Sequence, residues 1–267
     1  PFAAANYNMG WHSKGGHDRT FGTNAKAWDW CSVNNAGFEY YQNAKKDGIG
    51  LPPHNPRIWV FRHQSNASCA PMLRRVWHPI GYSSNSGWSN FFINITAGRL
   101  LTYTNTLLKF ALPDIVIGTG GGYNTYDIYE SVNHELSHAS HFNKVGSAFW
   151  AKYVNYIITY GKKYDHPYGD ASCNNSGFCG VGEMWGYAMG YIRTYEKYQQ
   201  KPKNGQSKWF QPNLLYDLMT EKILTKKQIF DCLSSDVTSH ALLKQKMISR
   251  YPSKKDSIIA KFSRYGF

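Results

Sequence analysis

The sequence has 267 residues, 42% of them hydrophobic and 16% aromatic, which excludes both a disordered chain and a disulfide-stapled miniprotein. Thirty Lys and Arg against 17 Asp and Glu give a formal net charge of +13. Because the basic residues lie in scattered pairs, we expect a solvated basic surface without a specific nucleic-acid partner. No apolar run approaches the roughly 20 residues of a membrane-spanning helix, so no transmembrane segment is expected.

The first half of the chain alternates short β-rich runs with Gly, Pro, Asn and Ser. Apolar spacing predicts a helix over 25–46, ended by the glycines that follow it. Strands are predicted over residues 57–62, 91–96 and 114–117. The apolar stretch 101–110 stays ambiguous between helix and strand.

The loop GTGGGY follows the third predicted strand. It has neither the G-x-G-x-x-G spacing nor a following Lys-Ser or Lys-Thr, so we interpret it as a flexible connection and not as a phosphate site. Helical patterns dominate the rest of the chain and predict helices over 126–143, 147–160, 181–199, 209–223, 225–233 and 236–250. The expected fold class is therefore α+β.

The first helix of this second half contains His134-Glu135-Leu136-Ser137-His138, an HExxH motif. Residues four apart on a helix are about 40° apart around the axis and about 6 Å along it, so both imidazoles can bind one ion. Glu135 can reach water bound to that ion without being a ligand. A separate, apolar face of the same helix carries Ile128, Val132, Leu136, Ala139 and Phe142. The motif predicts a zinc site, and the alternative is a set of polar residues on an exposed helix face.

A hydrolytic zinc site has three protein ligands and an open position for water, so a third ligand is needed. A metzincin is excluded, because its motif would place Gly and His where this chain has His141 and Lys144. His141 lies seven residues, or about 10.5 Å of helical rise, beyond His134, which is too far to bind the same ion. His141 could instead contact a zinc ligand or the substrate, or it could be an ordinary surface or packing histidine.

Only six Glu residues occur in the chain, and Glu183 stands out at the start of GEMWGYA. With HELSH and the strand at 114–117, this segment resembles the gluzincins, HExxH metallopeptidases whose third zinc ligand is a glutamate on a following helix. The resemblance covers about 110–200. Gly186 stands where many gluzincins carry Ala, a departure that favours close helix packing.

The resemblance implies a zincin-like fold. Residues 1–145 would form an N-terminal lobe with a small mixed sheet and the HExxH helix, and 146–267 a mainly helical lobe, the two making one catalytic unit. It also implies a metallopeptidase in which His134, His138 and Glu183 hold one Zn²⁺ and Glu135 is the general base. Tyr187 would orient a ligand histidine through its hydroxyl, or belong to the core.

By the same resemblance, strand 114–117 would pair with an extended substrate backbone, and a Tyr or His from the C-terminal lobe would stabilise the oxyanion. Candidates for that donor are Tyr168, His166, His240 and Tyr251. The expected partner is a peptide or protein substrate, with or without glycans, and the expected state is a monomer. Two other functions stay open: an inactive zincin-fold surface module that binds glycan or protein, and an amide hydrolase acting on cell-wall or glycan-linked substrates.

Five cysteines lack any CxxC pair, and two of them, Cys173 and Cys179, bracket the short loop NNSGF. They could form a local disulfide or remain unpaired thiols. With the abundant Asn, Tyr, Trp and Gly, this arrangement favours a secreted, periplasmic or cell-surface location.

Overall fold

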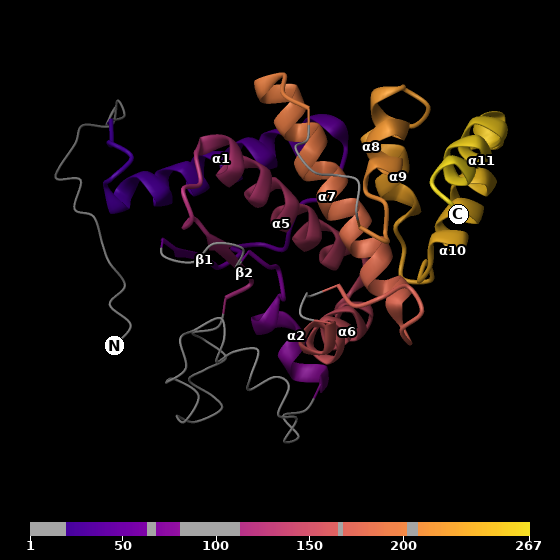
Figure 1. Ribbon diagram of the computed structural model, residues 1–267, viewed down its shortest axis with the longest axis horizontal. Helices are drawn as coiled ribbons and strands as arrows, with labels where there is room; N and C mark the ends of the chain where they lie inside the picture. Colours follow the sequence, from indigo (N-terminus) through magenta and orange to yellow (C-terminus); the bar gives the residue numbers. More distant parts are fainter. Residues whose placement is uncertain (1–19, 63–67, 81–112, 165–167, 202–207) are drawn as a thin grey trace.

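The computed structural model describes residues 20–62, 68–80, 113–164, 168–201 and 208–267. In this part of the chain the fold is mostly helical with a two-stranded parallel sheet, which confirms the α+β class (Figure 1). None of the described helices has both the length and the apolar character that crossing a bilayer requires.

The N-terminal elements are helix α1 (Lys26–Asp47) and strands β1 (Ile58–Phe61) and β2 (Ile115–Gly118). α1 ends as expected, because Gly48 adopts a left-handed conformation with φ of 67° that a glycine accepts without strain. β1 and β2 run parallel, with Ile58 opposite Ile115. The expected strand at 91–96 and the ambiguous stretch 101–110 lie outside the described residues.

Both edges of β2 are occupied within the described part of the chain. β1 covers one edge, and on the other Val116 exchanges two backbone hydrogen bonds of 2.8 and 3.0 Å with Cys69. Ser68 Oγ accepts a further bond from the Gly118 amide. The expectation that residues 114–117 pair with a substrate strand is therefore wrong. Among the described residues, this antiparallel bridge to Cys69 is the only departure from parallel pairing, so the expected mixed sheet is seen only as two parallel strands and one bridge.

Helix α2 (Leu73–Ile80) was not expected from the sequence. It is short and contains Pro79, so its local pattern gives no helical signal. Its position is fixed by Arg74 and Arg75, which lie 2.7 and 3.3 Å from the carboxylate of the fully buried Asp114 at the start of β2. This ion-pair cluster attaches α2 to the sheet.

Three long helices form the centre: α5 (Thr125–Val145), α6 (Ser147–Tyr164) and α7 (Ser176–Tyr198). α5 lies between α1 and α7 (Figure 1). It begins at a capping box in which Asn124 accepts from the Asp127 amide and Asp127 accepts from the Asn124 amide, which confirms the expected helix start. α7 begins five residues before the predicted 181, so the helix that carries Glu183 has an additional turn in front of it.

Close packing between α7 and its neighbours depends on glycines. A Cβ atom at Gly186 would lie 2.6 Å from Nε2 of His138, and one at Gly190 would lie 3.1 Å from a backbone oxygen of α5. A side chain at Gly182 would meet the ring of Tyr153 on α6 at 3.2 Å. The expected role of Gly186 in close helix packing is confirmed.

The C-terminal part contains α8 (Asn213–Thr220), α9 (Lys226–Cys232), α10 (His240–Arg250), the short 3-10 helix η1 (Pro252–Lys254) and α11 (Lys255–Arg264). α8 and α10 both pack on α7, and α11 packs on α8 and α10. α11 was not expected from the sequence, and it buries Ile258 and Phe262 completely. In Figure 1 these helices lie together on one side of α7, and their buried apolar side chains belong to the same core.

The disulfide considered between Cys173 and Cys179 is absent, since all five cysteines are free thiols. Cys179 belongs to the first turns of α7 and is fully buried in the core. Cys173 precedes that helix, and the Tyr156 hydroxyl hydrogen-bonds to it. The extra turn of α7 therefore separates two cysteines that the sequence places at the two ends of a loop.

Candidate metal centre

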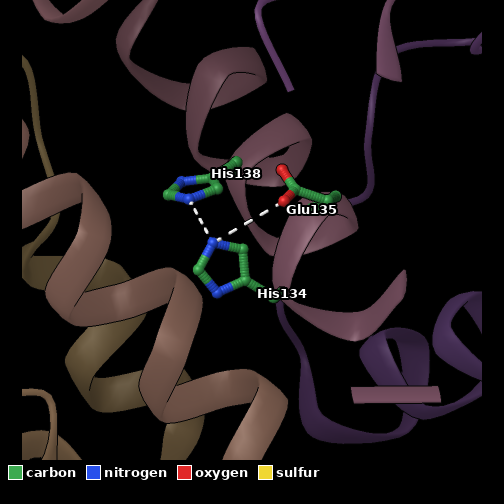
Figure 2. Close-up of side chains that lie close together, drawn as sticks. All are labelled: His134, Glu135 and His138. Carbon is green, nitrogen blue, oxygen red and sulfur yellow. Dashed lines mark hydrogen bonds and ion pairs between the residues drawn. The ribbon is translucent and has the colours of Figure 1, made fainter. Parts of the chain in front are cut away.

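The HExxH residues lie on the inner side of α5 and are almost completely buried. Nε2 of His134 is 2.9 Å from Nε2 of His138, and 3.8 Å from Oε1 of Glu135 (Figure 2). One ligand atom from each of the three residues lies within 4.8 Å of the others. The described part of the chain therefore holds a His-Glu-His group that is compatible with a bound metal ion.

Glu183 reaches this group from α7. Its Oε2 lies 3.5 Å from Nε2 of His134 and 3.6 Å from Nε2 of His138. A tetrahedral zinc ion with bonds of about 2.0–2.1 Å would separate its donor atoms by roughly 3.3–3.4 Å. With 2.9 Å between the two Nε2 atoms, the three atoms form a triangle whose mean side is close to that separation. Oε2 is buried and has no hydrogen-bond partner among the described residues, as expected for an oxygen that faces a cation.

Tyr153 of α6 holds the other oxygen of Glu183, because its hydroxyl donates a hydrogen bond to Oε1. Its ring also packs against His138, with the ring centres 5.7 Å apart. A ligand oriented by such a partner is a common feature of metal sites. Tyr153 was not expected from the sequence, because nothing distinguishes it from the many other aromatic residues of its helix.

Tyr187 contacts the site in a different way from the one expected. Its ring packs edge-on against the imidazole of His134, with centres 4.3 Å apart and an interplanar angle of 81°. Its hydroxyl lies 2.6 Å from the Tyr168 hydroxyl. Tyr187 therefore supports His134 through packing, and the expected hydrogen bond from its hydroxyl to a ligand histidine is wrong.

His141 is not a ligand, in agreement with the spacing argument. It is fully buried, and its ring packs against Phe149 and Trp150. Neither ring nitrogen has a hydrogen-bond partner within the described residues. Of the alternatives left open by the sequence, the structure shows packing.

The four expected oxyanion donors have different positions. Tyr168 lies beside the metal centre, where Lys208 Nζ sits 4.5 Å from the Tyr187 ring centre and 4.6 Å from that of Tyr168. Tyr251, which follows the last residue of α10, donates to the backbone oxygen of Gln228 in α9. His240 lines a separate cavity. His166 lies outside the described residues.

Burial and mutual charge set the ionisation of the centre in the metal-free chain. Burial, followed by the neighbouring His138, lowers the pKa of His134 to about 4, so its imidazole is neutral at pH 7 and able to bind a metal. Burial alone would raise the pKa of Glu183, but the two histidines lower it below its ordinary value. Burial and the charge of Glu183 raise the pKa of Glu135 well above its ordinary value.

Comparisons with protein-family models, curated proteins and solved structures found no match to this chain. The donor atoms themselves are therefore the basis for inferring a function. Two imidazole nitrogens and a carboxylate oxygen, which face one another inside the protein beside a second carboxylate, can bind a divalent cation and move a proton next to it.

Proposed function

We propose that the chain is a zinc-dependent metallopeptidase of the gluzincin type with a zincin-like fold. One observation carries the proposal: Oε2 of Glu183 lies 3.5 and 3.6 Å from the Nε2 atoms of His134 and His138, although 45 residues separate Glu183 from the motif. His134, His138 and Glu183 would hold one Zn²⁺. This His₂Glu donor set is typical of hydrolytic zinc sites and differs from the all-oxygen sets that bind Mg²⁺ and Ca²⁺.

When bound, zinc supplies Lewis acidity, which polarises a carbonyl group and makes water acidic near neutral pH. Glu135 accepts the proton of the attacking water and delivers it to the departing amine. Its Oε2 is buried and without a hydrogen-bond partner among the described residues, so it is available for this transfer. Its raised pKa belongs to the metal-free chain, and a cation beside it would lower that pKa.

Tyr168 is the best-placed donor for the oxyanion. Its hydroxyl lies 2.6 Å from that of Tyr187, whose ring covers His134. Burial, and then the charges of Glu183 and Tyr187, raise its pKa well above the ordinary value, so the hydroxyl keeps its proton and can donate it. Lys208, above the same two rings, adds positive charge.

The substrate and setting are part of the proposal. We expect a peptide or protein substrate, with or without glycans, a monomeric enzyme, and a location outside the cytoplasm. The free cysteines remove one of the observations behind that location, which now depends on composition alone.

The test combines metal analysis with cleavage of a broad peptide library. We expect wild type to hold one zinc ion per chain, and the Glu135→Gln variant to keep its zinc but lose about 10²–10⁴-fold in cleavage rate, since it lacks the general base. Zinc binding without cleavage of any peptide would favour the inactive surface module. A wild-type protein that binds no zinc would contradict both functions.

A further inference from the structure

Lys208 is a positively charged side chain beside the metal centre that has no anionic partner among the described residues. Its Nζ lies 4.5 Å from the ring centre of Tyr187, 4.6 Å from that of Tyr168 and 5.9 Å from that of Phe210. The side chain is half-buried, and within the described part of the chain Nζ makes neither a hydrogen bond nor an ion pair. An ammonium group that contacts only aromatic rings keeps its donors for an acceptor from outside the protein.

Two observations place Lys208 next to the metal centre. The Tyr187 ring below its ammonium also contacts the imidazole of His134, with ring centres 4.3 Å apart. Burial lowers the pKa of Lys208, and the charge of Glu183 opposes this shift. After burial and the neighbouring His138, the charge of Lys208 contributes in turn to the lowered pKa of His134. The ammonium and the donor atoms of the centre are therefore within electrostatic range of one another.

The centre is closest to solvent on the side of His134. The His134 side chain is 11% exposed, compared with 2% for His138 and 4% for Glu183. Tyr187, which packs on His134, is only partly buried, and so is Lys208 above it. A substrate that reaches the centre from this side would therefore pass the ammonium group.

The charges around the centre favour a singly charged anion next to Lys208. Glu135 and Glu183 together balance a divalent cation, so the ammonium group leaves one positive charge over. A carboxylate supplies one negative charge, and its oxygens accept hydrogen bonds from an ammonium group. The formal net charge of +13 would also attract acidic peptides to the protein.

We propose that Lys208 binds a carboxylate of the substrate close to the scissile bond. This inference rests on the proposed peptidase function and names its substrate class. Nζ and the His134 ring centre are at most about 9 Å apart, because they lie 4.5 and 4.3 Å from the Tyr187 ring centre, and an extended peptide covers that span in about three residues. A C-terminal carboxylate in this place makes the enzyme a carboxypeptidase, and an Asp or Glu side chain makes it an acid-specific endopeptidase.

The first experiment measures binding without turnover, by calorimetry on the full Glu135→Gln chain. One pair of probes is acetyl-Ala-Ala-Ala with a free C-terminus and its C-terminal amide. The other is acetyl-Ala-Glu-Ala and acetyl-Ala-Gln-Ala, both as amides. We expect the carboxylate member of at least one pair to bind about tenfold or more tightly than its neutral partner, because it bonds to a charged donor. The pair that discriminates identifies the source of the carboxylate, and if neither does, the proposal is wrong.

Variants in the same Glu135→Gln background attribute the preference to one ammonium group. It should disappear in Lys208→Met and persist in Lys208→Arg, which retains the charge. Lys152→Met is the matched control, since Lys152 also lies above an aromatic ring, 5.3 Å from the centre of Phe178, and it should leave the preference unchanged. The thermal midpoint shows whether each variant is folded. A preference that survives in Lys208→Met comes from another cation, such as the metal, and overturns the proposal.

The outcome for Lys208 can be separated from the outcome for the peptidase. Carboxylate binding that depends on Lys208, without cleavage of any peptide by wild type, would support the binding site and contradict the peptidase. Cleavage of matched acidic and neutral peptides with equal kcat/KM would support the peptidase and contradict the role of Lys208.

Discussion

His138 and His141 are three residues apart on α5, both almost completely buried, yet their surroundings differ. Nε2 of His138 faces His134 at 2.9 Å and Glu183 at 3.6 Å. His141 lies one turn later among Phe149 and Trp150, and its nitrogens meet no polar atom of the described residues. Burial alone does not place a histidine in a possible metal site. His138 belongs to one because donor atoms from two helices converge there, where glycines on α7 let that helix approach α5.

The largest effect is expected from Glu183→Ala, which would remove the carboxylate that α7 brings to the His134–His138 pair. Two imidazoles without the carboxylate form an incomplete hydrolytic zinc site. Zinc content, measured by mass spectrometry after gel filtration, should fall to background, and peptide cleavage with it. Stoichiometric zinc in this variant would mean that another residue is the third ligand.

Gly186→Ala tests the close approach of the two helices. The added methyl group would lie 2.6 Å from Nε2 of His138, so the imidazole or the helix must move. Overpacking of this kind costs about 1–3 kcal/mol, which corresponds to roughly a 5- to 150-fold loss of zinc affinity if the strain falls on the site. Competition with a chromogenic chelator measures that affinity. Gly22→Ala, at a position without a left-handed backbone where a Cβ meets nothing within 4 Å, controls for substitution of a glycine as such.

Tyr153→Phe removes one hydroxyl and retains the ring beside His138. Loss of the hydrogen bond to Glu183 Oε1 frees the carboxylate to rotate, and loss of an orienting partner typically lowers metal affinity about 10- to 100-fold. The same chelator competition gives the result. Tyr156→Phe is the control on the same helix, because the Tyr156 hydroxyl donates to the backbone of Tyr168 and Asp170 and not to the centre. Equal zinc affinities of wild type and Tyr153→Phe would show that Glu183 needs no such support.

The smallest effect on zinc is expected from His141→Phe, which should keep full metal content. Its effect is on stability at low pH. Burial lowers the pKa of His141 from 6.5 to about 3, so between these values the unfolded chain binds a proton that the folded chain excludes. Wild type should therefore lose roughly 1.4 kcal/mol of stability per pH unit at this residue as the pH falls through that window.

His141→Phe lacks this loss, so its advantage over wild type in urea unfolding should grow from pH 7 to pH 4. Chelator in both samples removes the contribution of the metal. An advantage that does not change with pH would contradict the burial of a neutral imidazole.

Site features that depend on a single helix could be predicted from the sequence. Features that depend on contacts between two elements could not. The HExxH spacing places His134 and His138 together because residues four apart share a helix face. Glu183 was found through its motif and the scarcity of Glu, whereas the hydrogen bond from Tyr153 joins α6 to α7 and has no local signature.

Two structural features were not predicted for a similar reason. Helix α2 depends on Arg74 and Arg75 meeting Asp114, about 40 residues away. The far edge of β2 is covered by Ser68 and Cys69, which belong to no regular strand. In both cases the stabilising partner is distant in the chain, and local periodicity does not report it.

The hydrogen bond between Tyr153 and Glu183 also determines denticity. With Oε1 engaged by the phenol, Glu183 has only Oε2 free to offer a cation, so in the proposed zinc site it would be a monodentate ligand. Three protein donors would then leave one position of the site to solvent, whereas a chelating carboxylate would crowd it. A phenol that does not itself bind the ion would thereby set how many coordination positions remain for chemistry.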